Sequence, residues 1–228
     1  MSRKEIREYV RFKKSVVFQH MALTVSVIGL MLSGYVLYSI RVNQNSESYF
    51  FFTNTVDWGQ IHVISGVILG ITLFWHLFYI LFSIYGHNDF MQMFLKRSEF
   101  KSIIRLGHQK GLKEKSRFGL QEKVTYWVIG TYIVLMLATG FLRLAHHFSI
   151  NYLSRELYVW MLEFHSYNGL LVGLLLLSWH LYSIFLKPGR FPGTLSWWDG
   201  KISENEMIRR ENYEEHQDKN FSDGECEL

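Results

Sequence analysis

Five histidines of this 228-residue chain lie inside apolar segments, where an ionisable side chain is costly and by default marks a functional site. Four of them belong to two segments with the same order of residues. The segments read His62, Gly66, Gly70 and Trp75-His76-Leu77, then His165, Gly169, Gly173 and Trp179-His180-Leu181. The fifth, His20, lies in an earlier apolar segment. Such a repeat indicates a shared task for the paired histidines.

Helix geometry indicates the nature of that task. Separations of 14 and 15 residues put the two imidazoles of each segment on roughly one helix face, about 21 to 23 Å apart. That length approaches the hydrocarbon thickness of a bilayer, about 30 Å. Two such helices side by side offer two His–His pairs, one near each membrane face. Facing helices that present neutral imidazoles are typical of haem binding. Glycines four residues on, Gly66 and Gly169, either let a flat macrocycle lie against the helix or serve as the small-residue helix contacts that are common in membranes.

The composition limits the alternatives. The chain is 49% hydrophobic and 17% aromatic, and its one cysteine, Cys226, lies in the polar tail. A single cysteine excludes an internal disulfide, a cysteine-ligated iron–sulfur cluster within this chain and covalent haem attachment. The net charge of +4 is modest, and we expect no nucleic-acid partner. The charged first ten residues and the long first apolar segment predict no cleavable signal peptide.

The apolar segments predict an all-α integral membrane protein that is a four-helix bundle. We expect a 1–15 amino-terminal segment, a 16–186 haem-binding domain and a 187–228 tail. Lysines and arginines crowd the amino terminus, the 86–123 loop and the tail, so the positive-inside rule places both termini in the cytoplasm. His62 and His165 then lie toward the outer face, and His76, His180 and His20 toward the inner face. The four spans are expected at 15–40, 58–85, 124–142 and 157–186.

A second, weaker echo relates the first and third spans, which contain Leu32-Ser33-Gly34-Tyr35 and Ala138-Thr139-Gly140-Phe141. It breaks at one place. His20 lies 14 residues before Gly34, whereas Tyr126 lies 14 residues before Gly140. Three roles for His20 therefore stay open: axial ligand of the inner haem in place of His76, hydrogen-bond partner in a quinone site, or ligand of a third haem.

Other uses of these histidines fit less well. Zinc favours four clustered ligands that usually include cysteine or a carboxylate. Proton pumping usually recruits Asp or Glu inside the spans, which have almost none, and Glu163 lies near an outer edge. The competing class is a non-redox membrane anchor or small transporter whose histidines are structural or bind a metal.

The chain also resembles the four-helix di-haem cytochrome b superfamily. This group includes the gamma subunits of membrane formate dehydrogenases, the cytochrome b subunits of nickel–iron hydrogenases, and relatives paired with periplasmic multihaem cytochromes c. The resemblance covers most of the chain. It rests on four stretches: Phe18-Gln19-His20, the His62…His76 helix, Leu120 to Trp127, and His180 to Gly200. The last two are most similar to the multihaem-associated branch.

The resemblance implies two non-covalent b-type haems, with a third as the alternative. His62 and His165 resemble the outer ligands and His180 an inner ligand, whose partner is His20 in one branch and His76 in another. It also implies a quinone site near the inner haem, at the level of 11–19 and 117–126. The expected protein is an electron-transfer subunit of a quinone-linked oxidoreductase in a bacterial or archaeal inner membrane. It would contact lipid and, within a hetero-oligomer, a periplasmic cytochrome c or iron–sulfur subunit.

Overall fold

The computed structural model describes residues 8–42, 56–95, 118–148, 154–186, 195–206 and 208. Four helical segments are long and apolar enough to cross a membrane. They are α1 (Lys14–Val42), α3 (Trp58–Phe82), α6 (Leu120–His147) and a fourth made of α7 (Arg155–Tyr167), η1 (Asn168–Val172), α8 (Gly173–Leu181) and η2 (Tyr182–Leu186). The predicted all-α integral membrane four-helix bundle is confirmed.

The chain divides into two compact units. We call the first the bundle unit; its described residues are 21–42, 56–94, 118–148 and 154–178. We call the second the sheet unit. It contains the start of α1 up to His20 and, from Trp179 onward, the end of the fourth segment and the described part of the tail.

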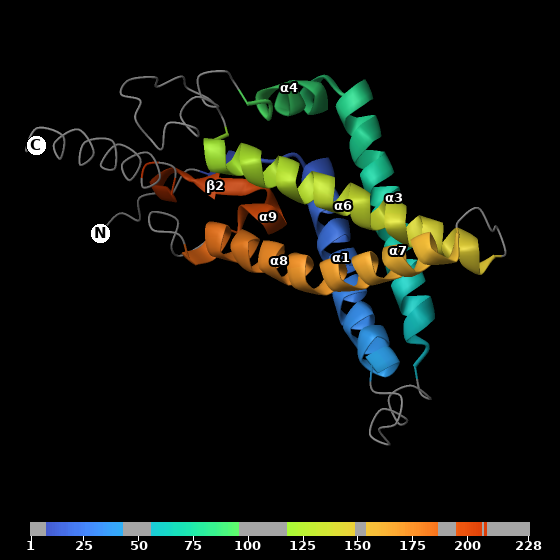
Figure 1. Ribbon diagram of the computed structural model, residues 1–228. Helices are drawn as coiled ribbons and strands as arrows, with labels where there is room; N and C mark the ends of the chain where they lie inside the picture. Colours follow the sequence, from blue (N-terminus) through green and yellow to red (C-terminus); the bar gives the residue numbers. More distant parts are fainter. Residues whose placement is uncertain are drawn as a thin grey trace, which may run out of the picture. The chain divides into compact units, whose positions relative to one another are not determined.

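Short polar residues set the helix ends in the bundle unit. Asp57 accepts a hydrogen bond from the Gln60 backbone at 2.9 Å and so begins α3. Ser83 follows the last residue of α3 and begins the short helix α4 (Ile84–Gln92), which Figure 1 shows after α3. The start of α6 is held by Glu122, whose carboxylate accepts from the Gly119 backbone at 3.2 Å. Polar caps of this kind satisfy backbone groups that the helix itself leaves unpaired.

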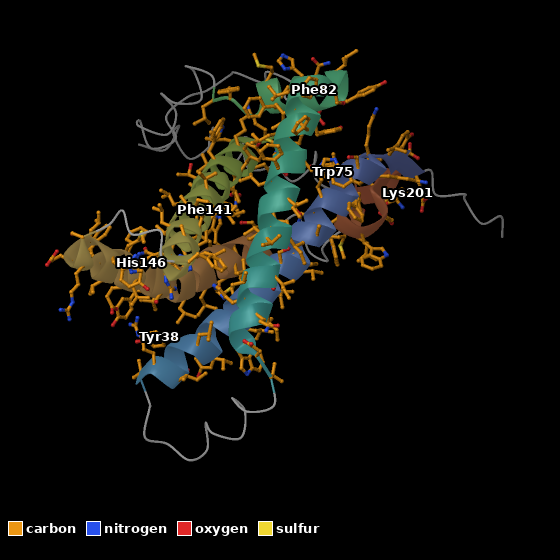
Figure 2. All side chains as sticks on the ribbon, turned by 90° about the vertical axis from the view of Figure 1, so that its right-hand side faces the viewer. Tyr38, Trp75, Phe82, Phe141, His146 and Lys201 are labelled. Atoms are coloured by element: carbon orange, nitrogen blue, oxygen red, sulfur yellow. The ribbon has the colours of Figure 1, made fainter. Side chains whose placement is uncertain are left out.

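The surface of the bundle unit is apolar, as lipid contact requires. Phe82 and Phe141, labelled in Figure 2, are 78% and 70% exposed. The interior instead uses small residues, because lipid tails compete equally well for large apolar side chains. Gly29 of α1 lies directly against Ser65 of α3, so a side chain at that position would clash. Close approach of backbones therefore holds these helices together.

A π-helical segment interrupts the fourth span. The Tyr132 hydroxyl of α6 donates to the backbone carbonyl of Asn168, the first residue of η1, at 3.1 Å. The Asn168 side chain donates in turn to the Phe164 carbonyl at 2.8 Å. Side-chain hydrogen bonds to backbone carbonyls thus accompany the π-helical turn. Such turns are frequent at functional sites.

The sheet unit contains an unpredicted two-stranded antiparallel sheet. Strand β1 (Glu8–Val10) pairs with β2 (Lys201–Ser203), and the adjoining helix α9 (Ser196–Asp199) is drawn with β2 in Figure 1. Gly200 has a left-handed φ of 75°, and its carbonyl accepts from the Phe12 backbone at 3.0 Å. Lys201 donates to Glu8 at 2.8 Å, and that hydrogen bond raises the pKa of Lys201. Three-residue strands give too little alternation to be read from a sequence.

Candidate haem-binding site

The bundle unit brings His62 of α3 and His165 of α7 together. We call these two residues the outer pair, after their predicted depth. Their ring centroids are 6.2 Å apart and their planes cross at 77°. Two imidazoles on opposite sides of one metal ion, at metal–nitrogen distances of about 2.0 to 2.1 Å, have centroids about 6.3 Å apart. The spacing of the outer pair therefore fits two axial ligands of one iron.

Each histidine of the outer pair is hydrogen-bonded through Nδ1 to a hydroxyl on a neighbouring helix. The Ser33 hydroxyl of α1 lies 2.9 Å from His62 Nδ1. The Thr139 hydroxyl of α6 lies 2.8 Å from His165 Nδ1. In both rings the other nitrogen, Nε2, is left as the atom to bind a metal. Ser33 and Thr139 occupy corresponding positions of the weaker repeat, but their contacts with the histidines were not predicted from the sequence.

Glycines follow both hydroxyl residues and lie against the imidazole rings. A Cβ added to Gly34 would lie 3.4 Å from Cε1 of His62, and one added to Gly140 would lie 3.2 Å from Cε1 of His165. The absence of a side chain at Gly140 thus gives the ring its place against α6. Gly34 and Gly140 were recognised in the sequence as parts of a repeat, but Gly66 and Gly169 were the glycines predicted to lie beside a ligand.

Gly66 and Gly169, the predicted macrocycle neighbours, lie against side chains of adjacent helices. A Cβ on Gly66 would lie 3.9 Å from Leu30, and one on Gly169 would lie 3.2 Å from Met136. Both positions are close helix contacts, the ordinary use of glycine in membranes. Their place beside a haem stays a prediction.

Charged residues flank the outer pair. Arg143 of α6 interacts electrostatically with both His62 and His165. Its Nε is buried, and no hydrogen-bond partner for that atom lies among the described residues. Arg41 of α1, by contrast, is matched by Glu163 of α7, with a nitrogen 3.0 Å from each carboxylate oxygen. Arg143 therefore supplies a cation beside the outer pair.

The sheet unit brings His20 of α1 and His180 of α8 together. We call these two residues the inner pair, again after their predicted depth. Their ring centroids are 6.3 Å apart, with an angle of 36° between the planes. This spacing also fits two imidazoles on one iron.

His76 contacts a different residue. Within the bundle unit, its Nε2 lies 3.0 Å from the hydroxyl of Tyr126 on α6. The ring centroids of the two residues are 6.1 Å apart. Tyr126 is the residue at which the repeat lacks a histidine. The structure thus places the Tyr126 phenol opposite His76. The repeat had shown that Tyr126 replaces a histidine, but not that it contacts His76.

An open pocket of about 470 Å³ lies between α6 and the fourth span of the bundle unit. Its lining includes Tyr132, Met136, Phe164 and Asn168. The Tyr132 hydroxyl and the Asn168 amide are both hydrogen-bonded to backbone carbonyls. The pocket therefore offers a mostly apolar surface, which favours a hydrocarbon group.

Four of the five histidines thus meet in two pairs, and the fifth, His76, contacts Tyr126. Among the described residues, no group of three or more His, Cys, Asp or Glu could hold a metal ion. The tetrahedral arrangement that zinc favours is not formed by these residues. Paired imidazoles inside an apolar bundle match the ligands of haem iron.

A comparison with known proteins agrees with this chemistry. A family model described as prokaryotic cytochrome b561 matches residues 11–196, which include the four membrane helices and the five intramembrane histidines. A search of curated proteins found no match. The family match carries with it haem b, electron transfer and the prokaryotic inner membrane. The chain belongs to the prokaryotic cytochrome b561 family and is an integral membrane b-type cytochrome.

Proposed function

We propose that this cytochrome binds two b-type haems and carries electrons across the membrane between the quinone pool and a periplasmic redox partner. The outer pair, His62 and His165, holds one haem, and the inner pair, His20 and His180, holds the other. The observation that carries the proposal is the spacing of the two pairs, 6.2 Å and 6.3 Å between ring centroids. Both distances would leave room for one iron ion held between the two imidazoles of a pair.

When bound, haem iron supplies one-electron chemistry between its ferric and ferrous forms. The chain's own residues hold the macrocycle, exclude water and set the charge around it. His165 and His180, one ligand from each pair, are 15 residues apart in the sequence, which corresponds to about 22 Å of helix. Ligands near both ends of the spans therefore allow electrons to cross most of the hydrocarbon layer.

Arg143 is the residue we assign to the outer haem's carboxylates. Its guanidinium interacts with both imidazoles of the outer pair, and its Nε has no partner among the described residues. A carboxylate is the natural partner of such a group in a low-dielectric site. Its charge also stabilises the reduced haem relative to the oxidised one, because the ferric iron carries one more positive charge.

We assign the quinone to the surroundings of Tyr126 and His76. Reduction of a quinone takes up two protons with two electrons. Its site therefore needs side chains that can donate hydrogen bonds to the quinone and accept them from the quinol. A phenol and an imidazole 3.0 Å apart supply both a donor and an acceptor. Tyr126 also belongs to the stretch that the family resemblance places at the quinone level.

The periplasmic partner is a cytochrome c or an iron–sulfur subunit that docks over the outer haem in a hetero-oligomer. This assignment rests on the family resemblance and on the charge distribution. The charge distribution favours a cytoplasmic location for both termini and for the basic 86–123 stretch, which would leave the outer face to the partner.

A spectrum and a haem count test the proposal. The purified protein is expected to show a sharp reduced α-band and two haems per chain by the pyridine haemochromogen assay. His20→Ala is expected to lose one haem, whereas His76→Ala keeps both. Absence of the α-band would end the cytochrome assignment. Loss of a haem from His76→Ala, with retention in His20→Ala, would exchange the inner ligand.

A further inference from the structure

The hydroxyl groups beside the outer pair have only one proton each, and the direction of that proton decides the tautomer of the histidine. The Ser33 hydroxyl lies 2.6 Å from the Gly29 carbonyl and 2.9 Å from His62 Nδ1. A carbonyl oxygen accepts only, so the hydroxyl proton belongs to that short contact. The hydroxyl oxygen then accepts from His62, whose Nδ1 must carry the hydrogen.

The same arrangement recurs on the other side of the pair. The Thr139 hydroxyl lies 2.9 Å from the Leu135 carbonyl and 2.8 Å from His165 Nδ1. Its proton goes to the carbonyl, and His165 Nδ1–H donates to the oxygen. Both imidazoles are thereby held as the same tautomer, with a lone pair on Nε2. This is the tautomer that a metal ligand needs.

We propose that Ser33 and Thr139 are positioning residues that fix the tautomer of His62 and His165 and set the reduction potential of the outer haem. The inference rests on the proposed function, because it presupposes that the outer pair binds iron. When a hydroxyl oxygen accepts a hydrogen bond from Nδ1–H, the imidazole becomes more basic and donates more electron density from Nε2 to the iron. Stronger donation stabilises the ferric state, so each hydroxyl lowers the potential.

Burial shields the Ser33 bond from water. Ser33 is fully buried, at 0% exposure, so water does not compete for its hydroxyl. The next residue in each case is a glycine, Gly34 or Gly140, against which the edge of the ring lies. The hydroxyl thus orients each imidazole, and at Gly140 the missing side chain also gives the His165 ring its depth. The repeat places the same two features beside both ligands.

The helix also provides a matched control. Ser26 of α1 donates to the Ala22 carbonyl at 2.7 Å and is 1% exposed. It makes the same bond to its own helix as Ser33, but no histidine contact of Ser26 is found among the described residues. If Ser33 served only to pack helices, its replacement and that of Ser26 would have the same effect.

The test compares Ser33→Ala, Thr139→Ala and the double variant with Ser26→Ala, all in the full-length haem-loaded protein. Potentiometric titration gives the midpoint of each haem, EPR gives the g-values of the low-spin ferric signals, and the haemochromogen assay counts the haems. We expect an upward shift of the outer midpoint in each alanine variant, largest in the double variant. The midpoint potential of the inner haem stays unchanged in these variants, and both midpoint potentials stay unchanged in Ser26→Ala. Ser33→Thr and Thr139→Ser restore the original midpoint.

Other results have defined meanings. Wild-type midpoints and g-values in the double variant, with both haems present, would overturn the inference and leave the proposed function intact. An equal shift of both midpoints, or the same shift in Ser26→Ala, would also overturn it. Loss of only the outer haem from an alanine variant, with retention in Thr139→Ser and Ser26→Ala, supports positioning. Absence of haem from the wild type would refute the proposed function itself.

Discussion

Replacing His62 by alanine separates the two proposed haems most directly. The two imidazoles of the outer pair have ring centroids 6.2 Å apart, and each would supply one ligand to the iron. His62→Ala therefore leaves the iron a single protein ligand. We expect the haem content to fall from about two to about one per chain, because each haem needs its own pair of facing ligands. The remaining α-band should be that of the inner haem, at an unchanged position.

The loss should also appear as reduced stability. A ligand present at about a hundred times its dissociation constant stabilises the native state by about 2.7 kcal/mol. The lost Ser33–His62 hydrogen bond adds about 1 kcal/mol. A protein of this size loses about 2 to 4 °C of melting temperature per kcal/mol, so we expect a decrease of about 7 to 15 °C.

The assay is a haemochromogen count on protein purified in detergent, together with a thermal melt followed by haem absorbance. His76→Ala is the matched control on the same helix, since it removes a histidine that lies against Tyr126. Loss of both haems from His62→Ala, or of neither, would refute the pairing of His62 with His165.

Three further predictions concern single contacts. Tyr126→Phe removes its hydrogen bond to the second-span histidine, which costs about 1 kcal/mol; we expect unchanged haem content but slower quinol turnover, and turnover at the wild-type rate would contradict the quinone assignment. Gly140→Ala should disturb the outer haem's EPR signal more than Gly34→Ala, since the added Cβ lies at 3.2 Å from the ring rather than 3.4 Å; equal spectra would refute this reasoning. A double-mutant cycle on Arg41 and Glu163 should give a coupling of about 0.2 to 1 kcal/mol, because both side chains are partly exposed; thermal melts of the single and double variants measure it, and a value several times larger would mean that the pair is shielded by lipid or by a partner.

The sequence by itself determined the four membrane spans and the chemistry of the site. A bilayer requires a long run of apolar residues for each crossing, so the helices can be recognised without knowledge of their neighbours. The cost of placing an imidazole in such a run marks the five histidines as functional. Their 14- and 15-residue spacing gives two depths, because the rise per residue of a helix is fixed.

Which side chains meet across helices was decided only by the tertiary structure. Helix periodicity gives the face on which His20 or His76 lies, but not the helix that the face meets. The pairing of His20 with His180, and of His76 with Tyr126, depends on how the helices pack. So does the pairing of each outer-pair ligand with a hydroxyl, because two residues more than 25 positions apart must come within 3 Å of each other. The repeat in the sequence showed that these positions correspond, and packing gave them their partners.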